Sequence, residues 1–478
     1  MKRGAPAGTL KVLTEADLHR IHTAALSLLG ETGVLSQSDV ILDLFHKNGA
    51  RVDRSSRVIR VPADMVEAAL KSAPKSFILY GRDPEQDLLI EFGRVYYGLG
   101  GTSEPFFWDS QLGRARHPTK ADMVAVTRVG QALPHIDFVM TLCSSGDMPP
   151  DQVFIHDYDA IFRNTTKPVV FSVLGRRSTA TLIEMAAAAC GGEREMRRRP
   201  WGMAIASSVS PLVVTPFNEG IIDAVEWGVP IRYGVGPMMG GTSPATVAGT
   251  VAQSLAEVLF GLVMVQLIKS GAPFVLAPNT NVMDMVTGQC TYSSPEQALG
   301  KMAVAQLGRF YQLPTWATGG GVESKLPDGE AVAQAMMTML LTGLAGITLN
   351  QNLGTLASGL YGSAEMAVIC DELAHMVKRV LAGFAVTDDT LAVDVVQEVG
   401  HGRTFMTHEH TLSHFKQELF FPVLFRRQTT DQWLEGGAKP IVDVAHQRVQ
   451  DILAQAGPMP LPPGAHEALE RIVRRGDD

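Results

Sequence analysis

The chain has 478 residues, of which 46% are hydrophobic and 19% are charged, and its formal net charge is −8. This composition supports a large buried core, while the negative charge and the lack of a Lys/Arg stripe along any helix argue against nucleic-acid binding. No run reaches the roughly 18 uninterrupted apolar residues of a membrane helix, because Glu257 and Gln266 interrupt the most apolar segment. We therefore expect no membrane partner.

The N-terminal region predicts three helices and a hairpin. Residues 13–30 form the first predicted helix, with Thr14 as N-cap and Asp17 completing a capping box. Residues 36–53 contain a second helix opened by Ser38 or Asp39, and residues 62–74 a third with proline in its first turn. Residues 76–98 read as a hairpin that turns near Asp83 and Pro84. This region is expected to cover the bottom or a flank of the domain that follows.

Eight apolar, β-branched runs come next, and each ends in Gly, Ser, Asn or Pro before a helical stretch. Apolar runs without alternation are typical of parallel strands buried on both faces, and eight of them with crossover helices predict an α/β fold, a (β/α)8 TIM barrel. The runs are residues 95–102, 136–145, 167–175, 201–211, 229–237, 273–281, 313–321 and 345–354.

The remaining residues extend the barrel at both ends. We predict an N-terminal helical and hairpin extension over residues 1–92, the barrel over 93–362 and a C-terminal helical extension over 363–478. The C-terminal extension begins with an amphipathic helix capped by Ser363. Further helices are predicted over residues 389–400, 410–421, 431–457 and 464–476.

Loops after the barrel strands are where a TIM barrel carries its chemistry. The first loop is rich in aromatic residues, and Trp316 ends the seventh strand, so these rings are candidates to hold a quaternary ammonium group on their π faces. The alternative is that the rings pack under loops. The aromatic candidates are Tyr97, Phe106, Phe107, Trp108 and Trp316.

The sixth and eighth strands end in amides, which can orient a carboxylate or bind the polar rim of a macrocycle without adding charge. These candidates are Asn279, Asn281, Gln351 and Asn352, and the alternative is that they cap loop backbone. The seventh loop adds Glu323 and Lys325 after three glycines, and these two side chains alternatively pair with each other.

A histidine-rich segment raises the question of a metal. His410 and His414 lie one helical turn apart, as two metal ligands would, but no carboxylate cluster completes the set in the sequence, so helix capping is the favoured interpretation. Four cysteines without paired spacing and an N-terminus without an apolar signal core predict a cytoplasmic protein with no bound metal. No GxSxG elbow or Ser-His-Asp set can be placed.

The chain resembles the trimethylamine methyltransferase family of corrinoid-dependent, methanogenesis-related enzymes. The matching stretches are GLGGTSEPFFWDSQLGRARHPTKADMVAV, NTTKPVVFSVLG, PMMGGTSPATVAGTVAQSLAEVLFGLVMVQL, ESKLPDGEAVAQAMMTMLLTGLAGITL and THEHTLSHFKQELFFPVL. Founding members of the family carry pyrrolysine in the barrel, whereas this chain has only standard residues. The resemblance therefore implies the non-pyrrolysine branch, whose known members demethylate glycine betaine and related quaternary amines.

The implied reaction moves a methyl group from a small betaine to the cobalt of a corrinoid (cobalamin). A quaternary nitrogen leaves as a neutral tertiary amine, so no general acid is required, and the cobalt is the nucleophile. Because the chain lacks the cobalamin-ligand pattern DxHxxG, we expect the corrinoid on a separate partner protein, and a homo-oligomeric enzyme. The alternatives are a betaine- or corrinoid-protein-binding protein without turnover and a metal-dependent barrel hydrolase.

Overall fold

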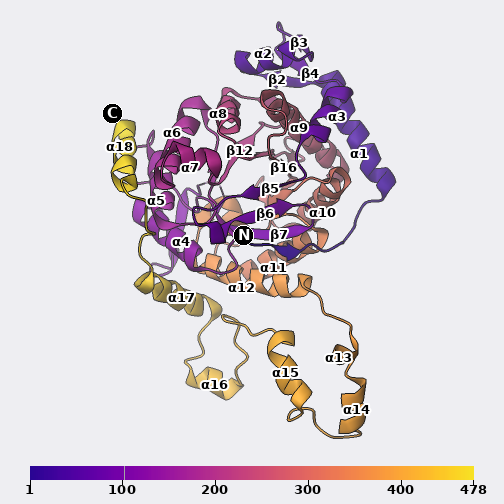
Figure 1. Cartoon of the computed structure of the whole chain (residues 1–478), viewed down its shortest axis with the longest axis vertical. Helices are drawn as coiled ribbons and strands as arrows, with labels where there is room; N and C mark the ends of the chain where they lie inside the picture. The colour runs from indigo at the N-terminus through magenta and orange to yellow at the C-terminus, as the bar shows by residue number, and fades with distance from the viewer. Residues whose placement is uncertain (102, 478) are drawn as a thin grey trace.

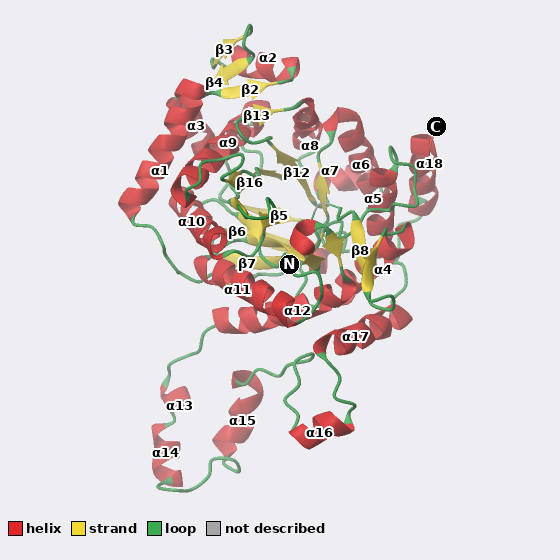
Figure 2. Cartoon of the chain, turned by 180° about the vertical axis from the view of Figure 1, so that it is seen from behind, coloured by secondary structure: helices red, strands yellow, loops and turns green. Residues whose placement is uncertain are grey.

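The computed structural model of the chain describes residues 1–101 and 103–477. Within them, eight parallel strands lie around a common centre and helices surround them (Figures 1 and 2). The strands are β7 (Arg94–Leu99), β10 (Phe138–Val139), β11 (Val170–Ser172), β12 (Met203–Ser207), β14 (Ile231–Gly234), β16 (Phe274–Ala277), β19 (Trp316–Thr318) and β20 (Leu349–Leu353). Each lies within one predicted run or overlaps it, which confirms the α/β barrel class. Thr102, which ends the first run, lies outside the described residues.

The strands form two parallel arcs rather than one continuous sheet. Backbone ladders join β10-β7-β20-β19 and β11-β12-β14-β16. Single parallel bridges connect the arcs at both ends, Val139 with Val169 and Leu276 with Thr315. The two weakest junctions of the barrel therefore lie between β10 and β11 and between β16 and β19.

A helix follows every strand of the barrel, as the alternation of the sequence predicts. These helices are α4 (Lys120–Ala132), α5 (Val153–Asn164), α6 (Gly175–Ala189), α8 (Gly220–Glu226), α9 (Val247–Ile268), α10 (Pro295–Tyr311), α11 (Gly329–Ala345) and α12 (Ala364–Leu381), with α7 (Glu193–Arg198) inserted after α6. The last of them, α12, has the predicted Ser363 cap and packs against α11 and α4. It thus occupies the position of the eighth barrel helix.

Helix α9 is apolar on all sides because it is covered on all sides. It packs on β14 and β16 of the barrel and on the N-terminal helices, and a helix without a polar face is typical of such burial. By length and composition alone it is also the one helix of the described residues that could cross a membrane, and it is mostly buried inside the protein.

The N-terminal region covers one flank of the barrel and closes one of its ends. Its elements are β1 (Ala5–Pro6), α1 (Glu15–Ser27), η1 (Leu28–Thr32), β2 (Val34–Ser36), α2 (Asp39–Lys47), β3 (Arg51–Asp53), β4 (Val58–Arg60), α3 (Ala63–Ser72), β5 (Ser76–Leu79), η2 (Pro84–Gln86) and β6 (Leu88–Glu91). The Thr14–Asp17 capping box and the predicted hairpin are confirmed. Leu79, Leu88 and Ile90 of that hairpin belong to the same apolar cluster as the barrel interior, so β5 and β6 plug the barrel from below.

Short strands and turns lie at the other end of the barrel, where the barrel strands have their carboxyl ends. They are β8 (Phe106–Asp109), β9 (Arg114–Arg116), β13 (Val213–Val214), η3 (Pro216–Glu219), β15 (Met238–Met239), β17 (Asn281–Met283), β18 (Cys290–Thr291), β21 (Thr355–Leu356), η4 (Ala357–Gly359) and β22 (Tyr361–Gly362). All of them lie in loops that follow the carboxyl ends of barrel strands, which is the side where a TIM barrel binds its ligands.

Beyond α12 the chain forms an arm that projects from the barrel before returning to it (Figures 1 and 2). The helices are α13 (Asp388–Leu391), α14 (Val393–Val399), α15 (Glu409–Glu418), α16 (Thr430–Glu435), α17 (Ile441–Gln455) and α18 (Ala465–Asp477). Two predicted helices are each split in two. Ala392 interrupts the first with a positive φ of 49°, and Gly436, Gly437 and Pro440 separate α16 from α17.

Candidate functional site

The barrel interior is apolar up to the level where the strands end. Its largest rings are Tyr96, Phe138 and Trp316, which are fully buried and belong to one cluster with β-branched and aliphatic side chains. Phe138 and Trp316 lie with ring centroids 5.2 Å apart. Trp316 therefore faces the inside of the barrel, but it begins β19 and does not end this strand as predicted.

One charged side chain interrupts this apolar interior. Arg232 lies on β14 between Ile231 and Tyr233, which face outward, and its guanidinium carbon is 5.5 Å from the centroid of the Trp316 ring. Arg232 is 8% exposed, and burial lowers its pKa to about 10, so it stays charged at neutral pH. Sequence reasoning missed this residue, although an arginine inside an apolar strand run was a readable signal.

The aromatic residues of the first loop do not all join this interior. Tyr97 points to the outside of β7, where its hydroxyl donates to the Met339 carbonyl oxygen of α11 at 3.2 Å. Phe107 and Trp108 on β8 are buried in the outer hydrophobic core, and Phe106 packs edge-on against Tyr361 with centroids 5.9 Å apart. The loop thus supplies rings to the rim, while Tyr96, the neighbour of Tyr97, faces the interior.

The same loop contributes a buried carboxyl that the sequence reasoning did not single out. Glu104 Oε1 accepts a hydrogen bond from the Thr355 hydroxyl at 2.8 Å, and Oε2 is buried without a partner. Burial raises the pKa of Glu104 to about 8, although the Thr355 hydrogen bond opposes the shift. At neutral pH the group is therefore mostly a neutral acid. No sequence motif marks it, since burial alone causes the shift.

The eighth strand brings amides to both the interior and the rim. Gln351 follows Leu349 by two residues, which places it on the inner face by strand alternation, and its Oε1 is buried without a partner. Asn352 has a positive φ of 71° and an unpaired Oδ1. A Cβ on Gly101 would lie 2.5 Å from Asn352 Nδ2 and 2.7 Å from Glu104 Oε1, so the glycine lets these two polar groups approach.

The polar candidates of the sixth and seventh loops hold those loops together. Asn281 Oδ1 accepts hydrogen bonds from Asn279 Nδ2 and from Gln297 Nε2, both at 3.1 Å. Glu323 accepts from the backbone N–H groups of Tyr292 and Ser293. These contacts match the loop-capping alternative for the amides.

The seventh loop also separates its two predicted charges. Lys325 is exposed, and no ion pair with Glu323 forms among the described residues. Asp328 instead caps α11 through the N–H groups of Glu330 and Ala331.

The sequence-predicted residues therefore fall into three groups. Trp316 lies in the interior beside Arg232, Gln351 lies on the inner face of β20, and Asn352 lies at the rim beside Glu104. Asn279, Asn281 and Glu323 are engaged in loop contacts, Lys325 is in solvent, and Tyr97 lies outside the barrel. Phe106, Phe107 and Trp108 lie on β8, and the last two are buried in the outer core.

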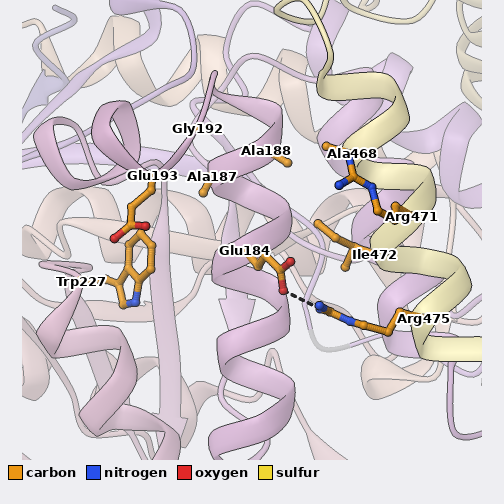
Figure 3. Close-up of a pocket in the computed structure, with 10 residues that line it drawn as sticks. All are labelled: Glu184, Ala187, Ala188, Gly192, Glu193, Trp227, Ala468, Arg471, Ile472 and Arg475. Carbon is orange, nitrogen blue, oxygen red and sulfur yellow. Dashed lines mark hydrogen bonds and ion pairs between the residues drawn. The ribbon is translucent and has the colours of Figure 1, made fainter.

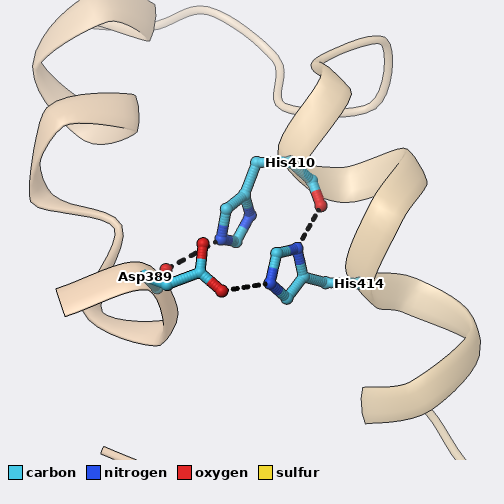
Figure 4. A group of neighbouring side chains, drawn as sticks. All are labelled: Asp389, His410 and His414. Carbon is cyan, nitrogen blue, oxygen red and sulfur yellow. Dashed lines mark hydrogen bonds and ion pairs between the residues drawn. The ribbon is translucent and has the colours of Figure 1, made fainter. Parts of the chain in front are cut away.

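In the folded chain, a carboxylate that the sequence analysis did not identify lies next to two residues of the histidine-rich segment. Asp389 of α13 approaches His410 and His414 of α15, and one potential ligand atom from each lies within 4.8 Å of the others (Figure 4). His414 Nε2 is 3.0 Å from the Asp389 carboxylate, and His410 Nε2 is 3.1 Å from the Asp389 carbonyl oxygen. The cluster thus already ties α13 to α15 by hydrogen bonds, far from the barrel interior.

A surface groove lies between α6 and α18, on the outside of the barrel (Figure 3). Trp227 forms one side, and an ion pair between Glu184 and Arg475 crosses the other. The groove is remote from the strand ends, so we do not assign it to the reaction.

Known proteins of one family match nearly the whole chain. The model of a family described as trimethylamine methyltransferase (MTTB) matches residues 3–478. Trimethylamine methyltransferase MttB of Desulfitobacterium hafniense DCB-2 is 34% identical and is aligned over 97% of this chain and 94% of its own. Glycine betaine methyltransferase of D. hafniense Y51 is 29% identical, over 98% and 97%. The solved hydroxylamine complex of MtmB shares the fold, with a TM-score of 0.51 and 13% identity over 93% of this chain and 95% of that one.

Proposed function

Because this chain belongs to the trimethylamine methyltransferase family, we propose that it transfers a methyl group from a small quaternary amine to the cobalt of a corrinoid. The proposed donor is glycine betaine or a related betaine, and the proposed acceptor is carried by a separate protein. The observation that carries the proposal is the family match over residues 3–478. One relative of the same length class is named for glycine betaine and another for trimethylamine.

The proposed reaction needs no general acid or general base from the protein. The methyl–nitrogen bond breaks with its electron pair left on nitrogen, and the amine leaves neutral, so no proton has to be delivered. The corrinoid, when bound, supplies the nucleophilic cobalt. The task of this chain is then to align the methyl group with the acceptor and to exclude water, which an apolar interior with Phe138 and Trp316 supports.

We propose that the mouth of the barrel receives the corrinoid, a polar macrocycle. The side-chain oxygens of Gln351 and Asn352 are buried and unpaired, and buried acceptors of this kind are normally satisfied. We propose that they accept hydrogen bonds from the acceptor's amide rim or from the substrate. The other predicted substrate residues stay predictions: Tyr97, Phe106, Phe107, Trp108, Asn279, Asn281, Glu323 and Lys325.

Turnover with a defined acceptor tests the function. Purified protein is incubated with chemically reduced cob(I)alamin and glycine betaine, proline betaine, carnitine, dimethylsulfoniopropionate or trimethylamine. We expect one betaine to convert cob(I)alamin to methylcobalamin, followed by absorbance, with the demethylated amine found by mass spectrometry. Saturable binding of a betaine without any methyl transfer to free cobalamin or to a corrinoid protein would favour the binding-protein alternative. Elemental analysis that finds stoichiometric zinc would favour the hydrolase.

We also propose that the enzyme is a cytoplasmic homo-oligomer in which the arm of residues 384–434 packs on a second copy. The arm exposes many large apolar side chains, among them Phe384 (81% exposed), Met406 (79%) and Val423 (74%). Apolar surface of this extent is typical of permanent interfaces rather than of partners that dissociate in each catalytic cycle. The division of the chain near residues 92 and 362 stays a prediction.

A further inference from the structure

Arg232 is a buried charge without a counter-charge. Among the described residues, no carboxylate pairs with its guanidinium and no acceptor lies within hydrogen-bonding distance of it, and its Nε is buried and unpaired. Its neighbours in the strand register are Ile205 and Val275, and the nearest aromatic ring is Trp316. The Nε–H donor is therefore buried without an acceptor, and the Nη donors have no acceptor among the described residues.

The guanidinium points toward the open end of the barrel. A Cβ on Gly234 would lie 2.3 Å from Arg232 Nη1 and 2.4 Å from its central carbon. Gly234 is two residues nearer the carboxyl end of β14, so the Arg232 side chain rises along the strand and fills the space of residue 234. Ser207, the register partner of Gly234, is exposed. The charge thus lies just below the level at which the interior meets solvent.

Such a charge destabilises the unliganded protein. A buried ion without a counter-charge loses its hydration, and the Trp316 ring beside it compensates only in part. If this position served packing alone, Met or Leu would fill it better. A guanidinium in an apolar pocket is, however, well suited to bind a carboxylate through two parallel hydrogen bonds, which become stronger as water is excluded.

We propose that Arg232 binds the carboxylate of the methyl donor and thereby restricts the enzyme to zwitterionic onium compounds. The proposal rests on the function proposed above and deepens it by naming the substrate class. A cation without a carboxylate, such as choline or trimethylammonium, would meet the uncompensated positive charge of Arg232 and be repelled. With its carboxylate held at Arg232, the onium end of a betaine faces the mouth, where the acceptor arrives.

Four ligands of nearly the same shape separate the contributions of the two charges. Glycine betaine carries both the onium group and the carboxylate, and choline carries the onium group and a hydroxyl. 3,3-Dimethylbutanoate and 3,3-dimethylbutan-1-ol replace the onium nitrogen of each by carbon. Their Kd values are measured by calorimetry for the wild type, for Arg232→Met and for Arg82→Met. Arg82 is the matched control, because its guanidinium carbon lies 5.4 Å from the Trp201 ring centroid, outside the barrel interior, and burial also lowers its pKa to about 10.

We expect the wild type and Arg82→Met to bind both carboxylates at least about 30-fold more tightly than the matching alcohols. In Arg232→Met this preference falls to within about 3-fold, while choline binds no more weakly than to the wild type. The unliganded Arg232→Met variant melts at or above the wild-type temperature, because an unpaired charge has been removed. A lower melting temperature with an unchanged preference for carboxylates would assign Arg232 a structural role and overturn the proposal.

The outcomes separate this inference from the proposed function. If Arg232→Met loses the carboxylate preference but no betaine methylates cob(I)alamin, the carboxylate site stands and the methyl transfer fails. If methyl transfer from choline is as efficient as from glycine betaine in the wild type, the methyl transfer stands and the role of Arg232 is refuted.

Discussion

At the scale of single residues, the burial of Glu104 at the barrel mouth changes the pH at which its carboxyl group ionises. Its carboxyl has a pKa of about 8 in the folded protein, against an ordinary value of 4.5, because it is buried. The folded state therefore binds more protons than the unfolded state between these two pH values. The stability contribution of the protonated group is complete below about pH 4.5 and is lost as the pH rises through 8.

We predict that Glu104→Gln flattens this part of the pH profile. Gln keeps an oxygen that accepts from the Thr355 hydroxyl but has no proton to lose. From pH 5 to pH 9, the wild type should lose on the order of 4 kcal/mol relative to the variant. Denaturant unfolding at five pH values gives the free energy of unfolding of both proteins. The contributions of the other titrating groups are the same in both and cancel in the difference between the two free energies. Parallel pH profiles would show that Glu104 is ionised throughout.

The indole of Trp316 is expected to contribute to substrate binding from inside the barrel. Trp316→Leu should raise the KM for the betaine by about 2- to 30-fold, because it removes the cation–π contact that holds the Arg232 guanidinium beside the proposed carboxylate site. Trp108→Leu is the comparison, because Trp108 lies on β8 in the outer core and should change KM less. Kinetics are normalised to the folded fraction, since either cavity lowers stability. Equal KM values for both variants and the wild type would remove the two rings from the site.

At the scale of elements, a buried lysine joins helix α4 to the strand that follows it. Lys167 Nζ donates to the carbonyl oxygens of Gly130, Leu133 and Ile136 at 2.8, 2.7 and 2.7 Å. Two of these carbonyls belong to the end of α4 and the third leads into β10, next to one of the two single-bridge junctions. The ammonium group thus satisfies acceptors that an α-helix leaves unpaired at its C-terminus.

Replacing that lysine should destabilise the barrel. Lys167→Met keeps the length of the side chain but leaves three buried carbonyl oxygens without donors, which is expected to cost about 3 kcal/mol. Lys47→Met on exposed α2 is the control and should change stability by less than about 0.5 kcal/mol. Urea unfolding gives both values. A Lys167→Met loss as small as that of the control would mean that water or neighbouring groups satisfy these carbonyls.

At the scale of the whole molecule, the arm of residues 384–434 has almost no hydrophobic core of its own within one chain. Only Val399 and Leu424 are buried in this segment among its apolar residues, and hydrogen bonds such as those of the Asp389–His410–His414 cluster hold its helices. A second copy would supply the core that the arm lacks.

We predict that charges on the arm dissociate the oligomer without unfolding the barrel. Met406→Glu with Val423→Glu should shift the mass seen by light scattering from a multiple of 51.5 kDa toward 51.5 kDa. Leu112→Glu, at an exposed turn outside the arm, should leave the mass unchanged. An oligomer that survives the arm substitutions, or a wild type that is monomeric at micromolar concentration, would contradict the arm interface.

The sequence by itself determined the order of strands and helices, many of their ends and the family, because these depend on local patterns. Apolar runs, the Thr14 and Ser363 caps and the Asp83–Pro84 turn act over a few residues and are correctly predicted. Only the tertiary structure decided which side of each strand faces the interior. A strand buried on both faces carries apolar residues at every position, so its sequence does not distinguish Tyr96, which faces inward, from Tyr97, which faces α11. Three further features depend on neighbours far apart in sequence, so only the folded chain revealed them. They are the lack of a counter-charge at Arg232, the raised pKa of Glu104 and the approach of Asp389 to two histidines.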